Sequence, residues 1–436
     1  MTAVQAVNAI ATGELTSEAL VAALLAQIRE REPVLQAWVH IDADAALAQA
    51  RTRDKTLADG HAPGPLNGIP VGLKDIIDTA DMPTTNGSDY YAGNMPARDA
   101  TATRLLREAG AVIMGKTVTT EFALTGARGT TNPHDPKRTP GGSSSGSAAG
   151  VAAGMVPLAL GSQTGGSMLR PASFCGVHAF KPSFGAISRA GVHIVSRRLD
   201  HLGIYARGIA DLALAGDVLM VRDAADTETR CHAGRELVRA LAEPLTAAPR
   251  LAVFRGEAWD FLEPGTEAAF EACIGRLAVD VAEADTAAAD GAFAAHRTIL
   301  NAGATANMGH YLDHADKLLP ETVRRISAGI DIKAADYVAA IDRAAEVGRD
   351  LDRLFEDFDA LLTPSAPGEA PVGLDGTGDP AFQKTWTLAG MPALNLPAMK
   401  GPNGMPIGLQ VIGRRGRDQD LFRVAQWMEA NGIYNN

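Results

Sequence analysis

Residues 141–170 of this 436-residue chain read GGSSSGSAAGVAAGMVPLALGSQTGGSMLR. Two Gly-Gly-Ser steps, at 141–143 and 165–167, enclose small residues and a short apolar segment. A flexible Gly-Ser linker is polar throughout, whereas this stretch contains apolar side chains such as Val151 and Leu160, which favour burial. We therefore interpret it as part of a folded core, in which a buried strand leads into the second Gly-Gly-Ser step.

The N-terminal part of the chain predicts an amphipathic helix. Thr16 is a typical N-cap residue. Leu20, Leu24 and Ile28 follow at four-residue spacing and give one apolar face. We expect Pro33 to end this helix, because proline removes a main-chain donor.

Helical and strand patterns alternate along most of the remaining chain, which predicts an α/β domain. A last helix is expected at 418–429, and the alanine-rich, charged residues 225–355 are expected to be helical. The expected strands lie at 69–73, 111–114 and 155–160 and in three short apolar runs within 359–412.

The composition is that of a globular protein, with 46% hydrophobic and 21% charged residues. A formal net charge of −11 argues against general binding of nucleic acid or anionic membranes. Cys175, Cys231 and Cys273 lack paired spacing, which favours a reducing compartment. Because no signal-peptide pattern and no run of roughly 18 apolar residues is present, we expect a cytoplasmic location.

Two familiar serine- and glycine-rich motifs fit the sequence poorly. The phosphate-loop pattern GxxxxGK[ST] is absent. Gly142–Gly146 matches GxSxG with Ser144 as nominal nucleophile, but that motif requires a strand directly before it. The preceding residues 132–141, NPHDPKRTPG, read as a loop.

The second Gly-Gly-Ser step fits an oxyanion hole better. If 162–166 form a turn and Ser167 opens a helix, this serine lies beside main-chain amides that have no helical partner. Gly165 and Gly166 would let a substrate carbonyl approach those amides without meeting a Cβ atom. Loss of one such donor typically costs on the order of 3 kcal/mol of barrier.

A nucleophilic serine also needs a base. His178, His193 and His201 lie shortly downstream and are candidates. Lys74 is another, because it ends the apolar run 69–73, and burial would keep its amine neutral. A solvent-exposed Lys74 is the competing interpretation.

Three motifs in this order resemble the amidase signature family. They are GIPVGLKDIIDTADMPTTNGS at 68–88, PGGSSSGSAAGVAAG at 140–154 and QTGGSMLRPASFCGVHAFKPSFG at 163–185. Residues 390–418 are also similar to that family, so the resemblance spans nearly all of the chain outside about 225–355. The resemblance implies one α/β domain over 1–436, in which α-helices cover both faces of a twisted mixed β-sheet, and catalysis without a metal or cofactor.

Carried over by position, the resemblance implies a catalytic triad. Lys74 would be the base, Ser143 the bridging serine after a cis peptide bond, and Ser167 the nucleophile. The family's oxyanion loop matches the main-chain amides of Thr164, Gly165, Gly166 and Ser167.

Two positions depart from the common family pattern. Gln163 replaces an acid four residues before the nucleophile, as in the branch that includes malonamidase. Arg170 stands where that branch contacts a substrate carboxylate, although a structural ion pair is an equal alternative. We take both, with Ser144, as candidate substrate-binding residues; Ser144 could instead be a helix-capping or network hydroxyl. The region 225–355 and the loop near Trp386 are expected to wall the pocket and select the substrate.

The expected function is hydrolysis of the C–N bond of small amides through an acyl-Ser167 intermediate, with carbamates, as in urethanases, a close variant. The expected partners are a small-molecule amide or carbamate and water, without nucleic acid or membrane, and with a homodimer as one option for assembly. The alternative is the glutaminase-type subunit of a tRNA-dependent amidotransferase, which works only with partner subunits. A non-catalytic binding protein is disfavoured because Lys74, Ser143 and Ser167 are all present.

Overall fold

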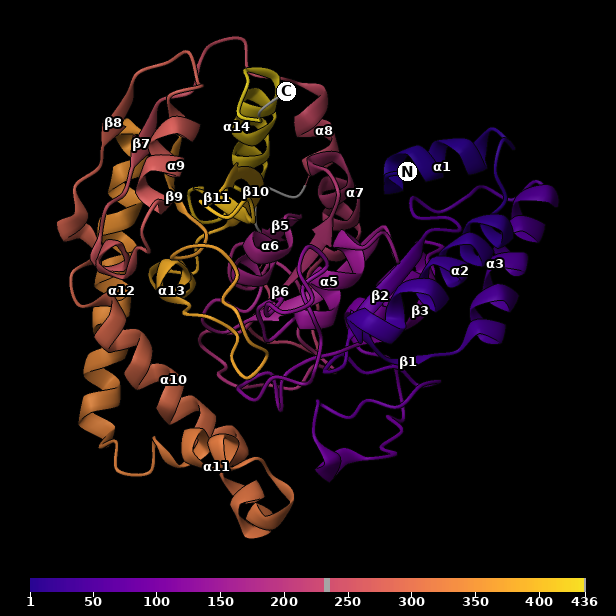
Figure 1. Cartoon of the computed structure of the whole chain (residues 1–436), viewed down its shortest axis with the longest axis horizontal. Coiled ribbons are helices and arrows are strands. Elements are labelled where there is room, and N and C mark those ends of the chain that lie inside the picture. Colours follow the sequence, from indigo (N-terminus) through magenta and orange to yellow (C-terminus); the bar gives the residue numbers. More distant parts are fainter. Residues whose placement is uncertain (231–235, 435–436) are drawn as a thin grey trace.

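The computed structural model describes residues 1–230 and 236–434. At its centre lies a mixed sheet of eleven strands in the order β1-β3-β2-β4-β6-β5-β10-β11-β9-β7-β8 (Figure 1). The strands are β1 (Trp38–Ile41), β2 (Pro70–Lys74), β3 (Val112–Thr117), β4 (Leu158–Gln163), β5 (His178–Lys181), β6 (His201–Ala206), β7 (Leu251–Val253), β8 (Val281–Glu283), β9 (Ala360–Pro364), β10 (Ala393–Lys400) and β11 (Pro406–Ile412).

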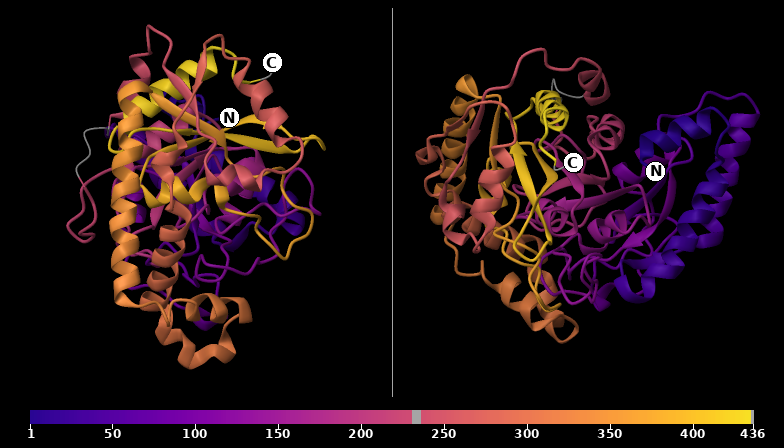
Figure 2. Two further views of the ribbon diagram at one scale, coloured as in Figure 1. Left: turned by 90° about the vertical axis from the view of Figure 1, so that its left-hand side faces the viewer. Right: turned by 45° about the horizontal axis from the view of Figure 1, so that its top comes forward.

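Helices surround this sheet (Figures 1 and 2). The α-helices are α1 (Ala3–Ala11), α2 (Ser17–Leu35), α3 (Ala43–Ala58), α4 (Thr101–Glu108), α5 (Ser145–Ala152), α6 (Leu169–Cys175), α7 (Ile209–Leu219), α8 (Leu237–Ala242), α9 (Thr266–Ile274), α10 (Ala292–Met308), α11 (Pro320–Ser327), α12 (Ala334–Asp357), α13 (Ala381–Leu388) and α14 (Asp418–Ala430). Short 3₁₀-helices are η1 (Asp89–Tyr91), η2 (Glu257–Phe261), η3 (Thr286–Ala289) and η4 (Gly309–Lys317). No described helix combines the length and apolar character that a membrane crossing requires.

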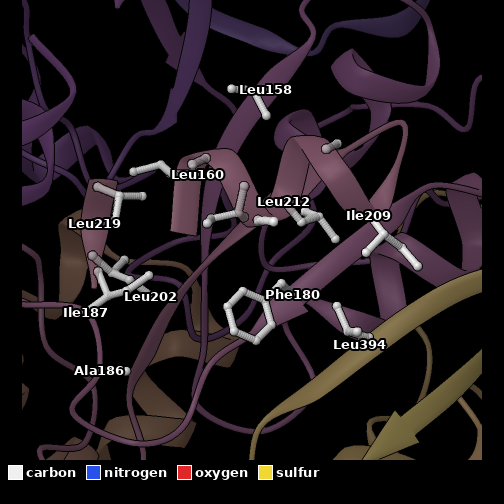
Figure 3. Close-up of a cluster of buried hydrophobic side chains, with 14 of the residues drawn as sticks. Leu158, Leu160, Phe180, Ala186, Ile187, Leu202, Ile209, Leu212, Leu219 and Leu394 are labelled. Carbon is white, nitrogen blue, oxygen red and sulfur yellow. The ribbon is translucent and has the colours of Figure 1, made fainter. Parts of the chain in front are cut away.

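Both faces of the sheet are buried, as expected for this fold class. Leu158 and Leu160 of β4 point into one apolar cluster, which includes side chains from α7 and α14. Ala159, between them, belongs to a second cluster, which includes side chains from α5 and α12. Figure 3 shows part of the first cluster, where Leu212 of α7 lies over the strands near Phe180. The α/β prediction, with helices on both faces of one mixed sheet, is confirmed.

The strand that ends at Lys74 and the strand that leads into the second Gly-Gly-Ser step are neighbours. β2 and β4 run parallel, with Leu73 opposite Leu160. Parallel strands buried on both faces read as continuous apolar runs, which explains why both were visible in the sequence. Because carboxyl ends of parallel strands meet at one edge of a sheet, Lys74 and the second Gly-Gly-Ser step come together there.

Three expectations about local structure are wrong. Helix α2 begins after the expected N-cap Thr16 but continues through Pro33 to Leu35, since a proline this close to the end disturbs only the last turn. Strand β4 continues to Gln163, because antiparallel pairing with β6 extends to that residue. The region 225–355 is not wholly helical, because β7 and β8 add two strands to one end of the sheet.

Two of the three cysteines lie in the described part of the chain. Cys175 and Cys273 are free and buried. Cys231 and part of the region 225–355 lie outside the described residues.

Candidate active site

Lys74 is completely buried at the end of β2. Its Nζ atom lies 2.6 Å from Ser143 Oγ and 2.8 Å from Ser162 Oγ. Burial lowers the pKa of Lys74 well below its ordinary value, and the charge of Asp200 partly opposes this shift. The surroundings therefore favour a neutral amine in contact with two hydroxyl groups.

Ser143 follows a cis peptide bond with Gly142, as the resemblance implied. Its carbonyl accepts a hydrogen bond from Thr120 N at 3.3 Å. A Cβ atom on Gly142 would lie 2.6 Å from the methyl group of Thr377, so only glycine fits here without a shift. The tight packing fixes the Ser143 hydroxyl beside the Lys74 amine.

Ser167 lies in the turn between β4 and α6 and is half-buried. Its carbonyl accepts hydrogen bonds from Ser144 N at 3.4 Å and from the Tyr205 hydroxyl at 3.3 Å. The main chain of Ser167 is thus bonded to the residue that directly follows Ser143. Within the described chain the Ser167 hydroxyl makes no hydrogen bond of its own, so it is available to a substrate.

The glycines before Ser167 leave main-chain donors free. In residues 1–230 and 236–434, the N–H groups of Gly165, Gly166 and Ser167 make no hydrogen bond. Gly165 and Ser167 are also partly exposed. Unused main-chain donors beside a partly exposed hydroxyl are the groups from which an oxyanion hole is built.

Thr164, the remaining residue of the expected oxyanion loop, is bound through its side chain. Its hydroxyl donates to Asp200 Oδ1 at 2.6 Å. Asp200 Oδ2 accepts from the main-chain N–H groups of Val195 and Ser196. Burial raises the pKa of Asp200 to about 6, and the hydrogen bond from Thr164 opposes this shift. Asp200 therefore binds the loop through Thr164, and its negative charge also acts on Lys74.

Gln163 does not face a substrate cavity. It is completely buried, and its Oε1 atom accepts from Met168 N at 2.9 Å and Leu169 N at 3.1 Å. Its Nε2 atom donates to the Thr387 hydroxyl at 3.0 Å. The structure therefore contradicts Gln163 as a substrate-binding residue, because its amide instead caps the start of α6.

Ser144 also makes its hydrogen bonds within the protein interior. The side chain is completely buried and does not cap α5. Its hydroxyl donates to Ser162 O and accepts from Ser162 N, both at 3.2 Å. A substrate-binding role for Ser144 is therefore wrong for this structure, and the network interpretation fits.

Arg170 is buried and donates to three acceptors of the chain itself. They are the carbonyl of Gly142 at 2.5 Å, the carbonyl of Gly378 at 2.6 Å and the Thr377 hydroxyl at 3.1 Å. Burial lowers the pKa of Arg170 to about 10, and the charge of Asp379 opposes this shift. Among the described residues, no carboxylate lies at contact distance from Arg170. It binds carbonyls instead, and one of them belongs to the peptide bond that precedes Ser143.

The three candidate histidines bind groups outside the triad. Their hydrogen-bond partners are the Tyr434 hydroxyl for His178, Met308 Sδ for His193 and the Leu199 carbonyl for His201. Trp386, expected in a loop of the pocket wall, is instead buried in α13 against Phe254.

Three residues near the site were not anticipated. Ser162 was placed in a turn, and only its position in β4 brings it beside Lys74. Asp200 and His296 have no local signal, because their contacts with Thr164 span 36 and 132 residues of sequence.

Comparison with known proteins finds relatives that are similar over nearly the whole chain. One of the glutamyl-tRNA(Gln) amidotransferase subunits of Chloroflexus aggregans is 36% identical, over 96% of this chain and 93% of that protein. Native peptide amidase from Stenotrophomonas maltophilia has a TM-score of 0.87 and 28% identity, over 100% of this chain and 98% of that chain.

A further solved structure is described as a vestigial protein complex that reveals the evolutionary origins of an s-triazine catabolic enzyme. It has a TM-score of 0.92 and 29% identity, and the match covers 100% of this chain and 99% of that chain. The family model for amidases matches residues 19–422. This chain therefore belongs to the amidase family, whose enzymes hydrolyse C–N bonds.

Proposed function

We propose that this chain hydrolyses the C–N bond of a small amide through an acyl intermediate on Ser167. The observation that carries the proposal is the contact between Lys74 and Ser143. A completely buried amine, whose pKa burial lowers well below its ordinary value, lies 2.6 Å from a serine hydroxyl. A neutral lysine can accept a proton and so act as a general base, which an ammonium group cannot do.

In the proposed reaction, Ser167 Oγ attacks the carbonyl carbon as its proton passes to Ser143, and the Ser143 proton passes to Lys74. The resulting oxyanion accepts hydrogen bonds from unused main-chain amides such as those of Gly165 and Gly166. Cleavage of the C–N bond returns a proton through Ser143 to the leaving nitrogen. Water, deprotonated by the same relay, then attacks the acyl ester and releases the acid and free Ser167.

The region 225–355 contributes to the surroundings of this site in the proposal. His296 of α10 contacts the carbonyl of Thr164, and its ring lies near Gly165. Tyr311 of η4 stacks on Phe122 with ring centroids 4.7 Å apart. These contacts support a role for the region in substrate selection. Carbamates, which contain the same carbonyl–nitrogen bond, belong to the substrate range to be tested.

A second candidate is the glutaminase-type subunit of a tRNA-dependent amidotransferase. The identity of 36% to the glutamyl-tRNA(Gln) amidotransferase subunit from Chloroflexus aggregans, over 96% of this chain, favours it over a free-standing amidase. The resemblance to a structure described as a vestigial protein complex also supports a partner protein. Both candidates need the same amide chemistry at Ser167, and they differ in substrate and assembly.

The test incubates the purified chain alone with glutamine, short aliphatic amides, aryl amides and aryl carbamates. Released ammonia or amine is measured, and mass spectrometry locates any acyl adduct. Turnover of a simple amide by the chain alone, with an adduct on Ser167 that Ser167→Ala lacks, supports the first candidate. Turnover of glutamine only after a partner protein is added supports the second. An adduct on another residue overturns the assignment of the nucleophile.

A further inference from the structure

Two side chains from later parts of the sequence bind the carbonyl groups of the oxyanion loop. His296, in the N-terminal part of α10, has its Nε2 atom 2.9 Å from Thr164 O. The Thr387 hydroxyl, on α13, donates to Gly165 O at 2.8 Å. The two successive carbonyls that precede the free amides of Gly165 and Gly166 are therefore both bound.

These contacts determine which way the free amides point. In a planar trans peptide, the C=O and the N–H lie on opposite sides of the chain. The Thr164 carbonyl shares its peptide plane with the Gly165 N–H, so a bond that fixes the carbonyl also fixes the amide. Glycine has wide conformational freedom, and without such bonds Gly165 and Gly166 would let both peptide planes rotate.

His296 is suited to this task. It is buried, and burial lowers its pKa to about 4, so the ring is neutral at ordinary pH. Because a carbonyl can only accept, Nε2 must carry the proton. A Cβ atom on Gly165 would lie 3.7 Å from His296 Cε1, so the ring also lies close to the loop.

We propose that His296 is a positioning residue for the oxyanion loop: by donating to Thr164 O it orients the Gly165 amide towards the developing negative charge. The inference rests on the proposed function, because it assumes that Ser167 is the nucleophile. Through His296, the region 225–355 would contribute to the chemical step as well as to the surroundings of the site. His296 acts through the loop and does not need to touch the substrate.

The test compares wild type with His296→Leu, which removes the donor at similar volume, and with His296→Gln, whose side-chain N–H can replace it. For an amide turned over by wild type, kcat of His296→Leu is expected to fall about tenfold with little change in KM, less than the 10²–10³ typical of a lost direct donor. His296→Gln should recover most of the loss.

Methyl- and phenylboronic acid provide a second measurement, because their tetrahedral serine adducts place an oxygen in the oxyanion hole. Their affinity should fall in His296→Leu by about the same factor as kcat. A loss confined to KM, or unchanged boronic acid affinity, would overturn the inference. If His296→Leu does not fold, ¹⁵N-histidine NMR of wild type decides instead: the inference requires an Nε2–H proton whose resonance shifts when the boronic acid binds, and its absence overturns it.

A failure of the proposed function would look different. In that case wild type itself would form no boronic acid adduct on Ser167 and would show no acyl adduct there. An adduct on wild-type Ser167 together with unchanged behaviour of His296→Leu would leave the proposed function standing and remove only the positioning role.

Discussion

At the scale of single residues, Lys74 is surrounded at contact distance by hydroxyl groups, and the carboxylate of Asp200 acts on it from farther away. Within residues 1–230 and 236–434, the amine therefore has no close ion pair that would keep it charged after burial. A neutral amine has a lone pair that can accept the Ser143 proton as Ser167 attacks the substrate. The proposed amide hydrolysis therefore depends on the protonation state of the Lys74 amine.

We predict that kcat/KM falls as the pH is lowered, with a limiting slope of one on a logarithmic plot. Burial lowers the pKa of Lys74, so the free amine predominates above that lowered pKa and the inactive ammonium below it. A kcat/KM that rises as the pH is lowered, or that shows no acid limb over the whole pH range in which the enzyme stays folded, would contradict Lys74 as the base.

Asp200→Asn supplies a sharper form of this pH experiment. The negative charge of Asp200 raises the pKa of Lys74. Its removal should therefore shift the acid limb of the profile to lower pH, while the Asn side chain can still bind Thr164. Because the carboxyl of Asp200 has a pKa of about 6, any second titration that it contributes to the wild-type profile should be absent from the variant. An acid limb that moves to higher pH would contradict the electrostatic argument.

Arg170 gives a second prediction at this scale. Arg170 binds the Gly142 carbonyl next to Ser143. The variant Arg170→Ala should therefore lower kcat roughly tenfold or more. The factor should be similar for a neutral amide and for an amide that bears a carboxylate. Added guanidinium should restore part of the rate. Arg170→Lys should recover little, because an ammonium group lacks the planar fork that reaches Gly378 and Thr377 together. A rise in KM confined to the carboxylate substrate would instead indicate direct substrate binding.

At the scale of elements, Gln163 links the end of β4 to the start of α6. Gln163→Leu leaves the buried N–H groups of Met168 and Leu169 without their acceptor. We predict a loss of about 1–3 kcal/mol in the free energy of unfolding, measured by urea denaturation. Gln163→Glu retains the acceptor and should lose less. Equal stability of wild type and Gln163→Leu would show that the cap is unimportant.

The elements differ in how well the sequence predicted them, and the reason is the range of the interactions that define each one. The N-cap Thr16 and the apolar run of β2 depend on neighbouring residues and were correctly anticipated. The end of β4 depends on pairing with β6, about 40 residues later, so Ser162 was misplaced in a turn. Strands β7 and β8 are three residues long. They are too short to show an alternation of apolar and polar residues within an alanine-rich region.

At the scale of the whole molecule, the candidate site joins segments from both halves of the chain. The serines and Lys74 come from residues 70–167, and motifs made them recognisable in the sequence. His296 and Thr387 reach the same loop from α10 and α13. No local sequence pattern indicates such residues, because a single hydrogen-bonding side chain on an ordinary helix forms no repeated spacing or motif.

Aromatic side chains bind the protruding end of the α10–α12 region (Figure 2) to the rest of the molecule. The ring of Tyr311, on η4, stacks on Phe122 at an interplanar angle of 4°, and its hydroxyl is 2.7 Å from that of Tyr91. Phe122 lies two residues after Thr120, whose N–H binds the Ser143 carbonyl. The packing of η4 is therefore connected through a short loop to the candidate site.

From this connection we predict graded effects at Tyr311. Tyr311→Phe loses only the hydroxyl contact, which should cost about 1 kcal/mol, whereas Tyr311→Leu also loses the stacked ring and should cost about 1–3 kcal/mol. Hydrogen exchange should then speed up in residues 309–317 and around Phe122, and kcat should fall in Tyr311→Leu more than in Tyr311→Phe. Faster exchange in 309–317 with unchanged exchange near Phe122 and unchanged kcat would mean that η4 packs against the core without influencing Ser143.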